Sequence, residues 1–293
     1  MAEKGGLVAY LNGWIVPYEE AIAKIGDGES RFGGFYDAER TFNGKVFKLH
    51  EHLERLYKGM EYANVDPGIR IDKMAEATSE VLDANRHLLS DEDDYIVSQV
   101  VVGSSSSGSG VNVVIYCQPI EFSSFAWGYV SGVCIITPIT YSVPPQRVKP
   151  GYNGNNPDVL SLSTDEYGYV TESRHSNFLF VKNGRIKLPN RSKSAAGISM
   201  ETVLELADKT DIPVDEDSYT SSDVYVADEA FVSGTRYCVM PASTLNGVTI
   251  GEALPGPITR KLMSAWSEEV GIDFVRQALD HLPNEDTQII PTG

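Results

Sequence analysis

The pattern of apolar residues in the first part of the chain predicts a β-hairpin followed by two helices. Short strand-like runs at residues 7–11 and 14–17 flank the pair Asn12-Gly13, a strong turn signal. Two later stretches repeat apolar residues at steps of three and four, the spacing that places them on one face of a helix. These residues are Leu49, Leu53, Leu56 and Met60 in the first stretch, and Met74, Val81, Leu82 and Leu88 in the second.

Further strands and helices continue a mixed α and β pattern. Strand-like runs lie at 95–102, 111–117, 132–137, 178–181 and 185–188, and helical patterns lie at 199–209 and 257–270. We expect the Gly- and Ser-rich tract 103–110 to be a flexible surface loop, with a phosphate-binding loop as the alternative, which the lack of a following Lys and helix disfavours. A change of pattern near residue 125 predicts an N-terminal α/β domain, 1–125, and a C-terminal mixed α/β domain, 126–293.

Composition and charge narrow the class of protein. The 293 residues carry a formal net charge of −17, which repels polyanions, so we expect no nucleic-acid partner. No apolar run approaches the roughly 20 residues of a membrane helix, and the N-terminus lacks the segments of a secretory signal. We therefore expect a soluble, cytoplasmic protein with no membrane partner. Cys117, Cys134 and Cys238 lie in apolar runs without close pairing, which favours buried thiols over a disulfide or a metal site.

Short motifs with a fixed order run along nearly the whole chain. Those of the first part are Tyr10-Leu-Asn-Gly13, Phe35-Tyr-Asp-Ala-Glu-Arg40, Asn43-Gly-Lys-Val-Phe-Lys-Leu49 and His52-Leu-Glu-Arg-Leu56. Those of the second part are Val143-Pro-Pro145, Gly168-Tyr-Val-Thr-Glu172, Ser176-Asn177, Gly197-Ile-Ser199, Ala227-Asp-Glu-Ala-Phe231, Gly234-Thr235 and Gly256-Pro-Ile-Thr259. In this order they resemble the class IV aminotransferases, and most closely their (R)-selective amine transaminase and branched-chain aminotransferase branch.

The resemblance implies the fold, the cofactor and the assembly. It implies an α+β, two-domain fold of the fold-type IV kind, like that of D-amino acid and branched-chain aminotransferases, with a barrel-like C-terminal domain. The cofactor of that family is pyridoxal 5'-phosphate (PLP), and its enzymes act on small molecules. We accordingly expect a homodimer, with each site between the two domains and close to the partner chain.

Four positions match the residues that hold the cofactor phosphate in the family. Arg55 lies on the polar side of the first predicted helix, where a guanidinium is well suited to a phosphate. Ser199 comes at the start of the helical pattern that follows Gly197, and the free N–H groups of a helix start bind phosphate. The resemblance assigns Arg55, the amides of Ile198 and Ser199, and Thr235 to the phosphate. The alternatives are a solvated helix arginine and a helix start without a ligand.

Other positions match residues around the cofactor ring and the substrate. The resemblance implies that the Glu172 carboxylate keeps the ring nitrogen protonated, and that Asn177 lies beside the cofactor or supports the end of a strand. Tyr36 and Asp37 would line the substrate pocket, with core packing as the alternative for Tyr36. Arg236 would receive a substrate carboxylate or would point to solvent.

The Schiff-base lysine of the family has two competing positions in this chain. An alignment without gaps from Val143-Pro-Pro145 places it on Asn153, whereas a short deletion places it on Lys149. The chain is shorter here than in the family, and the Pro- and Gly-rich stretch 150–157 cannot form the helix that the family has there. This segment is therefore rebuilt.

The function that the resemblance implies is a PLP-dependent transfer of an amino group between an amine or amino acid and a keto compound, with Lys149 as the general base. A lyase of the same family fits these residues equally. The rebuilt segment leaves two alternatives open. One is a PLP-independent relative that lost its lysine and catalyses isomerisation, cyclisation or hydrolysis. The other is a non-catalytic binding relative.

Overall fold

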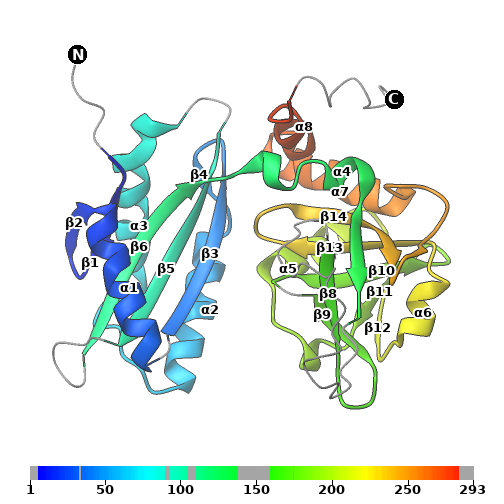
Figure 1. Ribbon diagram of the computed structural model, residues 1–293, viewed down its shortest axis with the longest axis horizontal. Helices are drawn as coiled ribbons and strands as arrows, with labels where there is room; N and C mark the ends of the chain where they lie inside the picture. Colours follow the sequence, from blue (N-terminus) through cyan, green and yellow to red (C-terminus); the bar gives the residue numbers. More distant parts are fainter. Residues whose placement is uncertain are drawn as a thin grey trace, which may run out of the picture. The chain divides into compact units, whose positions relative to one another are not determined.

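The computed structural model describes residues 6–32, 34–89, 93–103, 110–137, 159–173 and 175–283. The chain divides into two compact units, residues 1–120 and 121–293 (Figure 1). The two lysine positions predicted above, Lys149 and Asn153, lie outside the described residues, as does most of the Gly- and Ser-rich tract. The domain boundary near residue 125 stays a prediction. Among the described residues, no helix has both the length and the apolar character needed to cross a membrane.

The first unit is a six-stranded antiparallel sheet with helices on both of its faces (Figure 1). The strand order is β2-β1-β6-β5-β3-β4. The strands are β1 (Val8–Leu11), β2 (Trp14–Pro17), β3 (Gly34–Phe42), β4 (Lys45–Val46), β5 (Tyr95–Gly103) and β6 (Val111–Pro119). The helices are α1 (Tyr18–Phe32), α2 (Leu49–Tyr62) and α3 (Ile71–Asn85).

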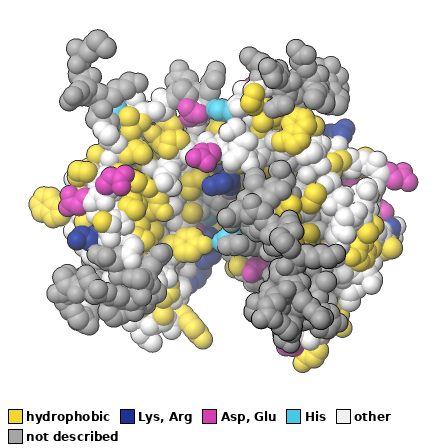
Figure 2. Space-filling model, viewed as in Figure 1, with side chains coloured by type: hydrophobic (Ala, Val, Ile, Leu, Met, Phe, Trp, Pro, Cys, Tyr) yellow, Lys and Arg dark blue, Asp and Glu magenta, His cyan; other side chains and the backbone are white. Residues whose placement is uncertain are grey.

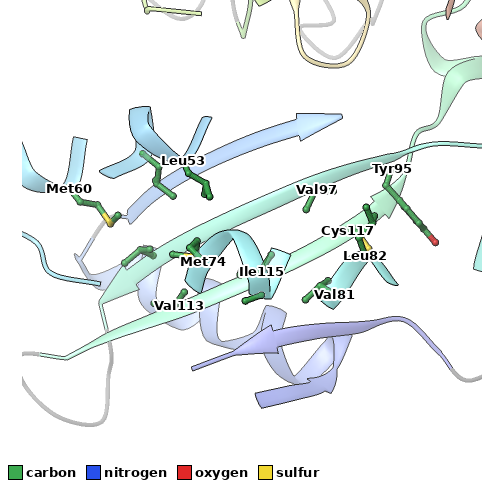
Figure 3. Packing of buried hydrophobic residues seen from close by; sticks show 13 residues of the cluster. Leu53, Met60, Met74, Val81, Leu82, Tyr95, Val97, Val113, Ile115 and Cys117 are labelled. Atoms are coloured by element: carbon green, nitrogen blue, oxygen red, sulfur yellow. The ribbon is translucent and has the colours of Figure 1, made fainter. Parts of the chain in front are cut away.

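A large apolar core lies between this sheet and helices α2 and α3 (Figure 3). Leu53 and Met60 of α2 and Met74 of α3 contribute to it, and each is almost completely buried. The first predicted helical face is thus confirmed in α2, and the second in α3 for Met74, Val81 and Leu82. Leu88 was wrongly included, because α3 ends at Asn85 and Leu88 lies in the short 3-10 turn that follows it. Ala21 of α1 belongs to a smaller core on the opposite face of the sheet.

The predicted hairpin at the start of the chain is confirmed. Asn12 and Gly13 both have a positive φ, 48° and 103°, which matches the conformation that Asn and Gly adopt most readily in tight turns. Asn12 also attaches the turn to β6, the other neighbour of β1 in the sheet, because its Oδ1 accepts a hydrogen bond from Val113 N at 2.7 Å. The turn residues therefore set the register of β1 against its neighbours.

The second unit is built on a nine-stranded mixed sheet. Eight strands follow the order β12-β11-β10-β13-β14-β7-β8-β9, and β15 pairs with β14. The strands are β7 (Val133–Ile136), β8 (Val159–Thr164), β9 (Val170–Ser173), β10 (Asn177–Lys182), β11 (Arg185–Pro189), β12 (Val214–Asp217), β13 (Glu229–Gly234), β14 (Cys238–Leu245) and β15 (Val248–Thr249). The helices are α4 (Gly128–Ser131), α5 (Ile198–Lys209), α6 (Ser221–Tyr225), α7 (Pro257–Val270) and α8 (Phe274–Leu279).

Helices α5 and α7 pack together and against β13 and β14. Their buried residues include Val203 and Leu206 of α5 and Leu262 and Trp266 of α7. This packing holds the first turn of α5 beside the ends of β10 and β13. The α+β fold with two units that the sequence predicts is confirmed.

Charged side chains do not gather in one patch on the face that Figure 2 shows. On the face in Figure 2, the Lys and Arg side chains of the described residues lie apart from one another, among acidic and apolar ones. The cysteines Cys117, Cys134 and Cys238 are free thiols.

Candidate functional site

The start of helix α5 is the first part of the candidate site. The helix begins at Ile198, and the residue before it, Gly197, makes no side-chain cap. Ser199 is the second helical residue and is 9% exposed. The N–H groups of the first turn have no partner within the helix. The predicted place of Ile198 and Ser199 in the first turn of a helix is therefore confirmed.

Other helix starts in the same unit are capped by carboxylates. Glu229 accepts hydrogen bonds from Ile258 N and Thr259 N at the start of α7, at 2.9 and 2.8 Å. Asp273 does the same for α8 through Val275 N and Arg276 N. Within the part of the chain that the structure describes, no side chain caps the start of α5, so its positive N-terminal end can accept an anion of another kind.

Two polar residues of the neighbouring strands fix the turn that leads into α5. The Glu172 carboxylate accepts a hydrogen bond from Ala195 N at 2.8 Å, and Asn177 Nδ2 donates to the Ala195 carbonyl at 3.0 Å. A Cβ atom on Gly197 would collide with Asn177 Oδ1. A side chain at 197 would thus force the Asn177 side chain or the turn to shift, so glycine permits the close approach of the α5 turn to the start of β10.

A buried hydroxyl lies beside this turn. Ser233 is 1% exposed and is paired in register with Asn177 across β10 and β13. Its Oγ has no hydrogen-bond partner among the described residues. Buried polar atoms in native proteins are almost always satisfied by protein, water or ligand. Thr235, half-buried, follows directly after Gly234, the last residue of β13.

The donor set of this region fits a phosphate group. It combines the uncapped first turn of α5, the hydroxyl of Ser233 without a partner among the described residues, and the hydroxyl of Thr235 just beyond. Backbone N–H groups and hydroxyls are the ligands that a phosphate takes at a helix start. The residues present therefore fit the phosphate of the cofactor that the resemblance implies.

In the first unit, Arg55 is held by a buried carboxylate. Its Nε and Nη2 donate to the two oxygens of Asp37 at 2.9 and 2.6 Å, and the same carboxylate is 2.8 Å from His52 Nδ1. The Asp37 side chain is 2% exposed and that of Arg55 is 36% exposed. The predicted position of Arg55 on the polar side of α2 is confirmed. The Asp37 carboxylate is buried under α2, and its place at the substrate pocket stays a prediction.

A second carboxyl group, Glu39, lies two residues further along β3. It is fully buried, and Gln99 Nε2 donates to its Oε1 at 2.8 Å. Burial first, and then the charge of Asp37, raises the pKa of Glu39 to about 8. Burial also acts to raise the pKa of Asp37, but the hydrogen bonds from His52 and Arg55 outweigh it, and that pKa lies below its ordinary value. The environments of the two carboxyl groups of β3 thus shift their pKa values in opposite directions.

The two residues expected at the substrate are exposed. Tyr36 of β3 is 67% exposed, which contradicts the alternative that it packs in the core. Arg236 follows Thr235 and is also exposed.

The sequence did not point to Asp37, His52 or Ser233 as partners of the expected site residues. The sequence did carry one signal that His52 and Arg55 are neighbours, because residues three positions apart lie on the same face of a helix. The contacts of Asp37 and Ser233 depend on how a strand packs under a helix or pairs with the next strand.

The chain is similar to known aminotransferases over most of its length. The family model described as amino-transferase class IV matches residues 34–156 and, as a second segment, 153–245. The match therefore breaks in the segment that the sequence marks as rebuilt. A putative branched-chain-amino-acid aminotransferase of Methanocaldococcus jannaschii is 28% identical over 279 residues, which cover 88% of this chain and 95% of the relative.

Solved structures show the same fold. The branched-chain amino acid aminotransferase of Escherichia coli has a TM-score of 0.75 at 20% identity, covering 90% of this chain and 94% of that one. The branched-chain aminotransferase of the archaeon Thermoproteus uzoniensis, solved with norvaline, has a TM-score of 0.74 at 23% identity, covering 91% and 96%. Another branched-chain amino acid aminotransferase, solved with pyridoxamine 5'-phosphate, has a TM-score of 0.74 at 22% identity, covering 91% and 95%.

Proposed function

Because the chain belongs to the class IV aminotransferase family, we propose that it moves an amino group between a branched-chain amino acid and a keto compound, with PLP as cofactor. The family match over residues 34–156 and 153–245 carries this proposal. The substrate class is supported by the names of the relatives, several of which are branched-chain aminotransferases. The comparisons favour neither PLP-independent chemistry nor a non-catalytic role.

The residues proposed to hold the cofactor phosphate are Ile198 and Ser199 through their backbone N–H groups, Thr235 through its hydroxyl, and Arg55 through its guanidinium. The uncapped start of α5 supports the first two. When bound, PLP supplies an electron sink for the bonds at the substrate's reacting carbon. Holding the phosphate through fixed backbone donors orients the group without any rearrangement of side chains.

Glu172 is proposed to keep a proton on the ring nitrogen. Its Oε2 already accepts a hydrogen bond from Ala195 N, which restricts the carboxylate to one orientation. A carboxylate beside a protonated ring nitrogen favours the charged form. Asn177 is proposed to support this arrangement, because its Nδ2 binds the carbonyl of the same residue, Ala195.

Lys149 is proposed as the lysine that attaches the cofactor and moves the proton at the substrate's Cα, with Asn153 as the competing aligned position. An amine in this role must lose its proton to act as a base.

Tyr36 and Arg236 are proposed to contact the substrate, Arg236 by binding a substrate carboxylate. The active assembly is proposed to be a cytoplasmic homodimer, and light scattering on the purified protein measures its mass directly.

An amino-transfer assay with matched donors tests the function. We expect the protein supplied with PLP to convert L-leucine or L-valine, with 2-oxoglutarate as acceptor, faster than (R)-1-phenylethylamine. The reason is that the relatives are named for branched-chain amino acids. The Lys149→Ala variant should lose at least about a hundredfold in rate, the scale of a lost general base.

The control is Lys58→Ala, which changes an exposed lysine on α2 and should leave the rate unchanged. Faster conversion of (R)-1-phenylethylamine would mean that the substrate is an amine and not a branched-chain amino acid, while amino transfer would remain the reaction. Absence of transfer from every donor in the presence of PLP would contradict the proposed function.

A further inference from the structure

The Asp37 carboxylate is a buried hub that joins strand β3 to helix α2. It accepts hydrogen bonds from Arg55 Nε and Nη2, from its neighbour Ala38 N at 2.8 Å, and lies 2.8 Å from His52 Nδ1. Its side chain and that of His52 are 2% and 4% exposed. Both belong to regular elements whose packing is fixed by the core around Leu53. The carboxylate therefore cannot change direction without disturbing that core.

This arrangement fixes one edge of the Arg55 guanidinium. A guanidinium is planar and rigid, so two bonds to its Nε and Nη2 determine the direction of the whole group. An arginine side chain that is ordered in advance loses less entropy when an anion binds. Burial of Asp37 as an anion is unfavourable unless it is paired, so the pair with Arg55 and His52 is maintained.

The charge state of the hub agrees with this role. Asp37 has a lowered pKa because the bonds from His52 and Arg55 outweigh its burial, whereas the buried Glu39 nearby has a raised one. Of these two buried carboxyl groups, the one that contacts Arg55 is thus the one whose charged form its partners favour. His52 Nδ1 lies 2.8 Å from Asp37 Oδ1 and 3.4 Å from Arg55 Nη2, so it contacts both members of the ion pair.

We propose that Asp37 and His52 are positioning residues that orient Arg55 for a phosphate group, so that the affinity for phosphorylated cofactor depends on residues that do not touch it. The inference rests on the proposed function, in which Arg55 is a ligand of the PLP phosphate. The opposite reading of the same contacts is competition, in which Asp37 occupies the guanidinium and weakens phosphate binding. The two readings predict changes of opposite sign when the carboxylate is removed.

The test compares PLP with pyridoxal, which lacks the phosphate, in binding to the cofactor-free protein by fluorescence titration. We expect Asp37→Asn to weaken PLP binding about tenfold, the scale of one charge-assisted hydrogen bond. Pyridoxal binding should stay within about twofold of the wild type, since no phosphate contact is involved. In the Arg55→Gln background the Asp37→Asn change should add nothing, because the two residues act as one unit.

His52 gives a second and independent route. His52→Asn places an amide donor near the position of Nδ1 and should keep the PLP affinity, whereas His52→Phe removes the donor and should weaken it as Asp37→Asn does. The matched control is Asp83→Asn, which removes the carboxylate of an exposed ion pair with Arg86 and should change neither ligand.

Each outcome decides the matter. Equal losses for PLP and pyridoxal, no loss, or tighter PLP binding in Asp37→Asn and His52→Phe would overturn the positioning role. A wild-type protein that binds neither PLP nor pyridoxal would instead contradict the proposed function. This result is distinguishable from failure of the positioning role, because there the wild type binds PLP and only the variants fail to show the expected loss.

Discussion

Glu39 and Asp37 show at the residue scale how local environment separates two similar groups. Both are buried on the helix-facing side of β3. The partners of Asp37 are Arg55 and His52 of α2. Glu39 is instead bonded to the neutral amide of Gln99, whose Nε2 also donates to Thr78 Oγ1 of α3 at 3.1 Å. Glu39 Oε2 and Gln99 Oε1 have no partner among the described residues. A proton on Glu39 would remove the cost of burying a carboxylate whose second oxygen has no donor among the described residues.

The buried Glu39 should make the stability of the first unit depend on pH. Its pKa rises from 4.5 to about 8 on folding, so the folded state binds a proton that the unfolded state has lost between these values. The stabilisation is fully present below 4.5 and is lost as the pH rises through about 8. The slope attributable to this residue is at most about 1.4 kcal/mol per pH unit.

Glu39→Gln should remove that dependence, because the amide is neutral at every pH. Urea unfolding of the two proteins between pH 5 and 9 measures the difference, which should grow in favour of the variant as the pH rises. The groups that face Glu39 from neighbouring residues, Asp37 and Arg55 among them, are present in both proteins and cancel in the comparison. Glu61→Gln on the exposed face of α2 is the control. Parallel stability curves for wild type and Glu39→Gln would show that Glu39 is ionised in the fold.

At the scale of single elements, apolar spacing predicts helices and hairpins but not what surrounds their ends. The helix over residues 257–270 agrees with α7, and the first helical face agrees with α2. The apolar pattern does not predict α1, because Gly26 and Gly28 interrupt it. The sequence could not predict the close contact of Gly197 with Asn177. The spacing of apolar residues describes a single helix or strand, whereas this contact joins two segments that meet only when the chain folds.

Replacing Gly197 with alanine should destabilise the second unit and disturb the start of α5. The new Cβ would collide with Asn177 Oδ1, and overpacking of this kind costs about 1–3 kcal/mol. Gly59→Ala in the interior of α2 is a control of opposite sign. Its Cβ would lie 3.7 Å from Phe35 Cδ1, an ordinary contact, so alanine should stabilise the helix by about 0.5–1 kcal/mol. Thermal unfolding measures both, and a stable Gly197→Ala variant would mean that the turn before α5 has room for a side chain.

At the scale of the whole molecule, the order of many weak motifs identified the family, which the match over residues 34–156 and 153–245 confirms. The family resemblance names the residues proposed for the phosphate, and the pattern of apolar residues adds only that Ser199 stands at a helix start, which the structure bears out. The lysine could not be fixed, because the family match itself breaks in the rebuilt segment. Substrate choice depends on side chains from several segments, so it also lay beyond the sequence.

Trapping the cofactor on its lysine tests the central claim most directly. The protein is incubated with PLP, reduced with borohydride, digested and analysed by mass spectrometry. We predict one phosphopyridoxyl group, on the peptide that contains Lys149, and its loss in the Lys149→Ala variant. A protein that carries no such group on any lysine after reduction would contradict the assignment as a PLP-dependent aminotransferase.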